Sequence, residues 1–293
     1  MPERGSLTMG RRRVASELRR LRELANLTGD EVAEQLGWSG SKVSRIELNR
    51  IGVKFDDLTR LLDLYGVGGT QRDELLALTK APRSRGWWEA YSDVVTAEYA
   101  GYLELESEAV TALCWSAQLV HGLLQTEDYA RAAMESHVEW MPVTPSGRIR
   151  RLIEVRLARQ RRMTEKGSLA LSVVLDESVL LRRIGHPEVM RTQLEHLVGV
   201  SRLPNVTVRV LPLAGAHPIG TGSFTVLAFP PLPGIEPPAD AVYLEQLARN
   251  AVYADKEDEA YQYRVAFERL TTESLNPDES RELIARVARE TWP

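Results

Sequence analysis

The stretch that most constrains the fold is residues 28–47, TGDEVAEQLGWSGSKVSRIE, because it specifies two short helices joined by a tight turn. Thr28 and Glu31 have the spacing of a capping box, in which each side chain accepts a hydrogen bond from the backbone amide of the other residue. Gly37 predicts the end of this first helix, and the hydroxyl of Ser39 is placed to cap a second one. A closely packed helical pair is therefore expected here.

The second helix, expected over about 39–48, has an apolar side and a polar side. Val43 and Ile46 are predicted to face inward. The side chains left on the outer surface are polar or basic: Ser41, Lys42, Ser44 and Arg45. Helix-turn-helix proteins use such a pair to place side chains in the major groove of double-stranded DNA. The alternative is a helix pair in an ordinary bundle, with Lys42 and Arg45 merely solvated.

The distribution of charge favours DNA binding over that alternative. Residues 1–54 contain 11 Lys and Arg against 7 Asp and Glu, a net charge of +4, whereas the whole chain carries −4 and the remaining 239 residues therefore −8. A basic segment on an acidic protein is the electrostatic footprint of a DNA-binding module. Residues 11–13, all arginine, begin a basic N-terminal arm that either contacts DNA or is a solvated tail.

The region from Val14 to Leu78 resembles the five-helix Xre (lambda-repressor-like) domain. Three later segments, SAQLVHGLLQTEDYARA (116–132), VVLDESVLLRRIG (173–185) and LPNVTVRVLPLAGAHPIGTGSFTVLAF (203–229), resemble the WhiJ-type regulators of actinobacteria. The resemblance implies a cytoplasmic, nucleoid-associated transcriptional regulator that binds DNA as a homodimer. Some such relatives pair with a small acidic BldB-type protein in a system resembling toxin–antitoxin modules.

The position of each residue in the motif predicts its role in binding DNA. Ser41, Ser44 and Arg45 are expected to read base edges, and the Arg45 guanidinium can donate two parallel bonds to guanine O6 and N7. The alternative for Arg45 is an ion pair with Glu47 or another neighbour. The groups expected to hold phosphates are Lys42, Arg50 and the backbone amides of Thr28 and Gly29. Ser39 and Gly40, at the start of the reading helix, complete the predicted DNA-binding set.

Two glycines depart from the pattern of the Xre family. Relatives usually carry glutamine where this chain has Gly29, and that glutamine touches the DNA backbone and braces the reading helix. Gly40 offers no side chain at a position that often reads a base. Fewer side chains are then left to carry specificity, and the basic N-terminal arm is a candidate to compensate.

Length and composition predict two domains. The chain of 293 residues divides into a helical DNA-binding domain over 1–80 and a larger α+β domain over 81–293, with the boundary near 79–85. The single cysteine, Cys114, excludes internal disulfides and cysteine-based zinc clusters and fits a reducing cytoplasm. No apolar run approaches the roughly 18 residues of a membrane span. We expect no cofactor and no metal.

Helices and strands alternate along the predicted larger domain. The alternation of Val206, Val208 and Val210 with polar residues indicates a half-buried strand. Strands are expected over 169–175, 206–211, 223–229 and 241–244. Helices are expected over 104–115, 125–134, 148–163, 255–270, from Pro187 and from Pro277. The proline-rich segment 230–238 is expected to be an exposed loop.

An enzyme is the less favoured interpretation of this domain. The sequence contains no His-Glu-x-x-His pair, phosphate-binding loop, dinucleotide fingerprint or Gly-x-Ser-x-Gly elbow. Asp176 and Glu177 end a predicted strand, where catalytic carboxylates often stand, and His217 lies in a loop. The favoured alternative is that Asp176 or Ser178 caps the next helix. The loop 215–222, GAHPIGTG, is either a ligand-binding loop or an ordinary glycine-rich hairpin loop.

Two further clusters could bind a partner. The first is an aromatic set made up of Trp87, Trp88, Tyr91 and Trp115. Aromatic residues can line a pocket but more often anchor a core or a domain interface. An arginine-rich helix over 148–162 faces DNA, an acidic partner or, as the safer interpretation, solvent. We therefore expect a transcriptional regulator whose larger domain senses a small-molecule effector or a protein. The rivals are an antitoxin-like interaction module and an enzyme.

Overall fold

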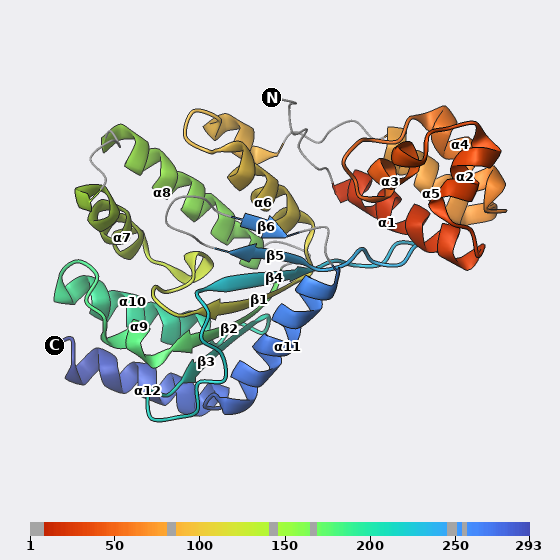
Figure 1. The fold of residues 1–293 in the computed structure, drawn as a ribbon. Coiled ribbons are helices and arrows are strands. Elements are labelled where there is room, and N and C mark those ends of the chain that lie inside the picture. Colours follow the sequence, from red (N-terminus) through yellow and green to blue (C-terminus); the bar gives the residue numbers. More distant parts are fainter. Residues whose placement is uncertain (1–8, 81–85, 141–145, 165–168, 245–250, 254–256) are drawn as a thin grey trace.

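The computed structural model describes residues 9–80, 86–140, 146–164, 169–244, 251–253 and 257–293. The first of these ranges is a small bundle of five helices, which we call the head (Figure 1). Its helices are α1 (Met9–Leu24), α2 (Gly29–Leu36), α3 (Gly40–Glu47), α4 (Phe55–Leu64) and α5 (Gly69–Lys80). The predicted domain boundary falls largely on 81–85, outside the described residues.

The head closes around apolar residues that recur at helical spacing. Leu18 of α1, Val32 of α2, Val43 of α3, Leu58 of α4 and Leu75 of α5 share one core, and none of these side chains is more than 2% exposed. Each helix therefore contributes the apolar stripe that its sequence predicts.

The helix-turn-helix forms with one local difference from the prediction. Both bonds of the Thr28–Glu31 capping box are present, and Gly37 ends α2 in the left-handed region at φ 66°. Ser39 occupies the cap position of α3, but its hydroxyl lies 3.2 Å from Ser41 Oγ and makes no cap bond to the α3 backbone. The predicted capping by Ser39 is therefore wrong, because its hydroxyl has a competing side-chain partner.

A mixed sheet forms the centre of the larger domain. Among the described residues it has six strands in the order β3-β2-β1-β4-β5-β6. Their bounds are β1 (Thr111–Ser116), β2 (Ala170–Asp176), β3 (Val206–Leu211), β4 (Phe224–Ala228), β5 (Ala241–Leu244) and β6 (Ala251–Tyr253). β1, β2 and β3 are parallel, whereas β4, β5 and β6 join antiparallel.

Helices cover both faces of this sheet (Figure 1). One face packs on α6 (Ala97–Glu108), α7 (Glu127–Trp140), α8 (Ser146–Gln160), α9 (Glu177–Leu181), α10 (Pro187–Val200) and α12 (Pro277–Glu290). The other face packs on α11 (Glu257–Glu273). Alternate residues serve the two faces, as Cys114 and Trp115 of β1 show. The domain is α+β, as expected, and its described part also contains the short 3-10 helices η1 (Trp87–Tyr91), η2 (Gly122–Leu124) and η3 (Arg161–Met163).

The sheet topology corrects two sequence-based expectations for this domain. The helix expected over 104–115 ends at Glu108, and residues 111–116 form β1, because strand partners on both sides outweigh local helix preference. The loop 215–222 is not a hairpin loop. Since β3 and β4 are separated by β2 and β1, residues 212–223 cross the carboxyl ends of the parallel strands.

Candidate nucleic-acid interface

The outward surface of α3 is the candidate site for reading bases. Val43 and Ile46 are 2% and 3% exposed, and burying them turns Ser41, Ser44 and Arg45 toward solvent. Arg45 Nε donates to Ser41 O on its own helix at 3.1 Å. The outward triplet is therefore short and polar, with one long cationic side chain.

The expected alternative partner of Arg45 is engaged elsewhere. Glu47 accepts from Arg22 at the end of α1, with Nε–Oε1 at 2.8 Å and Nη2–Oε2 at 3.0 Å. This hydrogen bond raises the pKa of Arg22. A largely buried carboxylate at the end of the reading helix is thus paired within the head, and Arg45 is left to face solvent.

Lys42, expected to hold a phosphate, is tied to the neighbouring elements. Its Nζ lies 2.9 Å from Asp57 Oδ2 on α4 and 3.7 Å from the centre of the Trp38 ring. Both contacts favour a side chain that lies along the α3–α4 contact. The structure therefore gives Lys42 an internal role in addition to any role on DNA.

The amino terminus of α2 also has an internal occupant. The Thr28 amide, expected to bind phosphate, donates to Glu31 Oε2 at 2.7 Å. That hydrogen bond and a second one from the Thr28 hydroxyl lower the pKa of Glu31. A phosphate at this end of α2 would therefore have to displace the capping carboxylate from the Thr28 amide.

A hollow of about 380 Å³ lies where the amino termini of α2 and α3 meet the end of α1. Gly29 and Gly40 line it, together with the side chains of Arg19, Arg22 and Asp30. A Cβ on Gly40 would lie 2.5 Å from Asp30 Oδ1, so the carboxylate fills the space that the glycine leaves. A side chain at residue 40 would therefore have to displace the Asp30 carboxylate, a constraint that the sequence did not reveal.

Arg50 stands in the loop that follows α3. Asn49, at φ 52°, turns the chain, and the amides of Arg50 and Ile51 donate to Arg45 O. Arg50 is exposed, as a phosphate-binding side chain requires. Unlike Lys42 and the Thr28 amide, which have partners within the head, Arg50 has the solvent exposure expected of a phosphate ligand.

In its described part, the basic N-terminal arm is helical and is not a solvated tail. Residues 11–13 lie within α1, and Arg12 and Arg13 are each 4% exposed. Both donate to carbonyl oxygens of the segment that joins β4 to β5, so they contact the larger domain. The expectation that residues 230–238 form an exposed loop is wrong at two positions, because Pro230 O accepts from Arg13 and Ile235 is only 3% exposed. Sequence reasoning missed this contact, and the apolar Ile235 amid prolines was its available signal.

The polar residues at the end of β2 form a local capping arrangement. Asp176 Oδ1 accepts from the Ser178 amide at 2.9 Å, so the predicted cap of the next helix, α9, is confirmed for Asp176. His217 Nε2 lies 3.3 Å from Asp176 Oδ2, and Glu177 accepts from the Leu213 amide at 2.8 Å. These contacts fasten the crossing loop 212–223 to the carboxyl end of β2.

The arginine-rich helix, α8, is divided between the interior and the surface. Arg159 is buried against Glu106, with Nη2–Oε2 at 2.6 Å and Nε–Oε1 at 2.9 Å, and donates to the Tyr102 hydroxyl. The expectation of a wholly solvated basic face is therefore wrong for Arg159. Arg148 and Arg150 of α8 are exposed, and so is Arg161, which directly follows the helix.

The aromatic residues are likewise divided between core and surface. Trp115 is buried in the sheet, and Trp88 packs against the core. Trp87 and Tyr91 instead line an open hollow of about 740 Å³ beside α8, next to Leu157 and Arg161. The expected role in a core therefore fits Trp88 and Trp115, whereas Trp87 keeps 36% of its surface exposed.

Comparison with known protein families gives a match for each part of the chain. Residues 13–75 match the family described as "Helix-turn-helix domain", and residues 99–286 match the family described as "Domain of unknown function (DUF5753)". No curated protein and no solved structure matches the chain. Across the described part of the chain, no helix has the length and apolarity that crossing a membrane requires. A DNA-binding helix-turn-helix region is thus followed by an α+β domain.

Proposed function

Because the chain belongs to the DUF5753 family and carries a helix-turn-helix domain, we propose that it is a sequence-specific transcriptional regulator that reads double-stranded DNA with α3. The observation that carries the proposal is the outward triplet of Ser41, Ser44 and Arg45 over a buried Val43 and Ile46. Since Glu47 is bound by Arg22, the Arg45 guanidinium can turn to a guanine.

The proposed regulator acts as a homodimer of the WhiJ type. One eight-residue reading helix contacts few bases, and two heads on two half-sites supply the specificity that one lacks. The larger domain binds a small-molecule effector or a protein partner. Its occupancy shifts the geometry of the heads and hence the affinity for the operator, by linkage between the two sites. The proposal assigns no catalytic role to the domain.

The test is genome-wide DNA binding in vitro at a stated salt concentration, comparing the wild type with Arg45→Ala. Arg183→Ala is the matched control, because Arg183 is an exposed arginine of the larger domain. We expect a short, two-fold-symmetric site whose base preference Arg45→Ala relaxes by about 1–3 kcal/mol at one position per half-site. Salt-sensitive binding without a preferred site, unchanged by Arg45→Ala, would overturn the assignment.

A second candidate function is binding of a small acidic protein of the BldB type, as in antitoxin-like systems. The hollow lined by Trp87, Tyr91 and Arg161 favours it, since exposed aromatic and arginine side chains are typical of interface centres. Co-expression with such a protein should give a stoichiometric complex that Trp87→Ser weakens and Arg183→Ala does not. A complex indifferent to Trp87→Ser would remove this hollow from consideration.

A further inference from the structure

The connection between β4 and β5, residues 229–240, extends from the sheet to the head, and we call it the arm (Figure 1). From its contacts we infer that Arg12 of the head and Ile235 of the arm are positioning residues for DNA binding: they fix the orientation of α3 relative to the larger domain. This inference rests on the proposed function.

The tip of the arm is inserted into the head. Leu232 and Ile235 exchange backbone hydrogen bonds of 3.2 and 2.9 Å around a tight turn, with Gly234 in the left-handed region at φ 70°. Ile235 is 3% exposed and belongs to the apolar core of the head. A Cβ on Gly234 would lie 3.2 Å from the Cβ of Gln71 on α5, so the backbone approaches the head closely. The tip is thus part of the packing of the head.

The root of the arm, residues 239–240, is held by a second, polar contact. Arg12 Nη2 donates to Ala239 O at 2.5 Å and to Asp240 O at 3.0 Å, and its guanidinium lies 5.2 Å from the centre of the Phe229 ring. Arg264 of α11 in turn donates to the Asp240 carboxylate at 2.8 Å. The root therefore joins α1 to a helix that covers the sheet.

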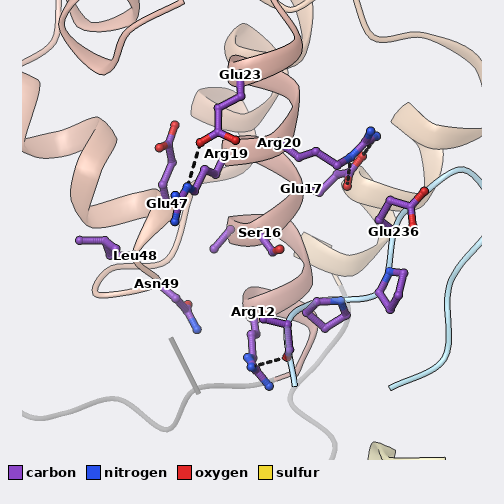
Figure 2. A pocket seen from close by; sticks show the side chains of 14 residues that line it. Arg12, Ser16, Glu17, Arg19, Arg20, Glu23, Glu47, Leu48, Asn49 and Glu236 are labelled. Atoms are coloured by element: carbon purple, nitrogen blue, oxygen red, sulfur yellow. Dashed lines mark hydrogen bonds and ion pairs between the residues drawn. The ribbon is translucent and has the colours of Figure 1, made fainter. Parts of the chain in front are cut away.

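The arm between these two contacts is stiff but incompletely packed. Five of its residues are prolines, which fix φ and restrict bending: Pro230, Pro231, Pro233, Pro237 and Pro238. A hollow of about 420 Å³ separates residues 236–239 from α1 and from Leu48 and Asn49 (Figure 2). A stiff arm held at two separated points prevents rotation of the head. Met9, which packs in the core of the larger domain, is a third point.

Neither positioning residue belongs to the outward surface of α3. Arg12 and Ile235 are buried between the head and the arm, whereas Ser41, Ser44 and Arg45 remain exposed. Substitutions at Arg12 or Ile235 therefore remove no side chain that is expected to contact a base. What they change is how two heads in a dimer are placed on two half-sites, which sets the preferred spacing.

The first measurement is the distance between spin labels on the head and on the larger domain of the full chain. Labels at Glu34→Cys and Glu188→Cys are suitable because both positions are exposed, and the native Cys114 is buried. We expect one narrow distribution for the wild type and for the control Arg183→Ala. Arg12→Gln and Ile235→Ser should each broaden it, and the double variant should broaden it most. Narrow distributions in all three would overturn the inference.

The second measurement is DNA affinity across half-site spacings altered one base pair at a time. The wild type should prefer one spacing by roughly tenfold or more, and Arg12→Gln should flatten that preference while keeping the affinity for a single half-site. Loss of half-site affinity in Arg12→Gln with the spacing preference intact would overturn the positioning role. Should the wild type bind no preferred site, the proposed function fails, and the label distances still decide whether the arm orients the head.

Discussion

The guanidinium of Arg22 donates to both carboxylate oxygens of Glu47, which fastens the end of α1 to the end of α3. The Arg22 and Glu47 side chains are 16% and 9% exposed, so removing the arginine leaves a poorly solvated carboxylate. We expect Arg22→Ala to destabilise the head by about 1.5–3 kcal/mol. The measurement is hydrogen exchange of the α3 amides, which should accelerate roughly tenfold for each 1.4 kcal/mol.

Arg19→Ala is the matched control for this prediction. Arg19 also lies on α1 and pairs with Glu23 at 3.0 Å, but both side chains are about half exposed. An exposed pair at i,i+4 contributes only about 0.3–0.5 kcal/mol. Equal acceleration of the α3 amides in Arg19→Ala and Arg22→Ala would show that the Glu47 contact does not hold α3.

Lys42 and Arg50 should differ in how they affect the salt dependence of DNA binding. Lys42 is bound to Asp57 and lies over the Trp38 ring, whereas Arg50 is exposed in the loop after α3. Arg50→Ala should lower the slope of log affinity against log salt by about 1, the effect of losing one phosphate contact. Lys42→Ala should leave the slope unchanged and cost about 0.5–1 kcal/mol of stability. An equal fall in slope for both variants would show that Lys42 also contacts a phosphate.

Asp30 places a negative charge in the hollow between α2 and α3, against Gly40. Asp30→Asn keeps the shape of the side chain and removes that charge. We expect DNA affinity to rise by roughly fivefold, equivalent to about 1 kcal/mol of relieved repulsion from phosphates. Fluorescence anisotropy titrations at two salt concentrations measure it. Asp73→Asn, on the exposed side of α5, is the control, and an equal gain there would attribute the effect to net charge.

Removing one partner of the buried pair of Arg159 and Glu106 should strongly destabilise the larger domain. Their side chains are 5% and 3% exposed, and Tyr102 completes the cluster by donating to Glu106 at 2.7 Å. Arg159→Met leaves the Glu106 carboxylate without its cation and should cost about 3–5 kcal/mol in urea unfolding. The double variant Arg159→Met/Glu106→Leu should recover much of that loss. A double variant less stable than Arg159→Met would contradict this account.

His121 should make the domain sensitive to mild acid. Burial, followed by repulsion from Arg159, lowers the pKa of His121 to about 3. The folded state then binds no proton at His121 between about pH 6.5 and 3, whereas the unfolded chain does, so stability falls as the pH falls through this window. The loss from pH 7 to 5 is at most about 2 kcal/mol.

His121→Gln tests this pH dependence in urea unfolding at pH 7, 6 and 5. As the pH falls, the variant should lose stability less steeply than the wild type. Part of the pH dependence should remain, because burial also lowers the pKa of His196. His186→Gln, at the exposed start of α10, is the control. Equal slopes in the wild type and His121→Gln would show that the ring takes up its proton in the folded state.

The head could be predicted from sequence because its signals are local. The capping box spans Thr28 to Glu31, and Gly37 ends α2 a few residues later, so each feature is determined by its immediate neighbours. The partner of Lys42 is less local. Asp57 lies on another helix, and no periodic pattern connects the two residues. The outward surface of α3 was therefore predictable, but the contacts that modify it were not.

Strand β1 and the arm were missed because both depend on distant segments. Residues 111–116 become a strand by pairing with β2, about 60 residues later, and with β4, more than 100 residues later. The arm contains no helical or strand periodicity, and Ile235 finds its apolar surroundings in helices that end at Lys80. Local propensity contains no information about such pairings, which tertiary context decides.

The insertion of Ile235 into the head also sets an order of assembly during synthesis. A ribosome adds Ile235 some 155 residues after Lys80, a delay of roughly 8–30 s at ordinary elongation rates. The five helices are therefore synthesised long before the apolar residue that completes their core. A nascent or prematurely terminated chain would present a head able to touch DNA in any orientation, so orientation control is acquired late, with the completed sheet.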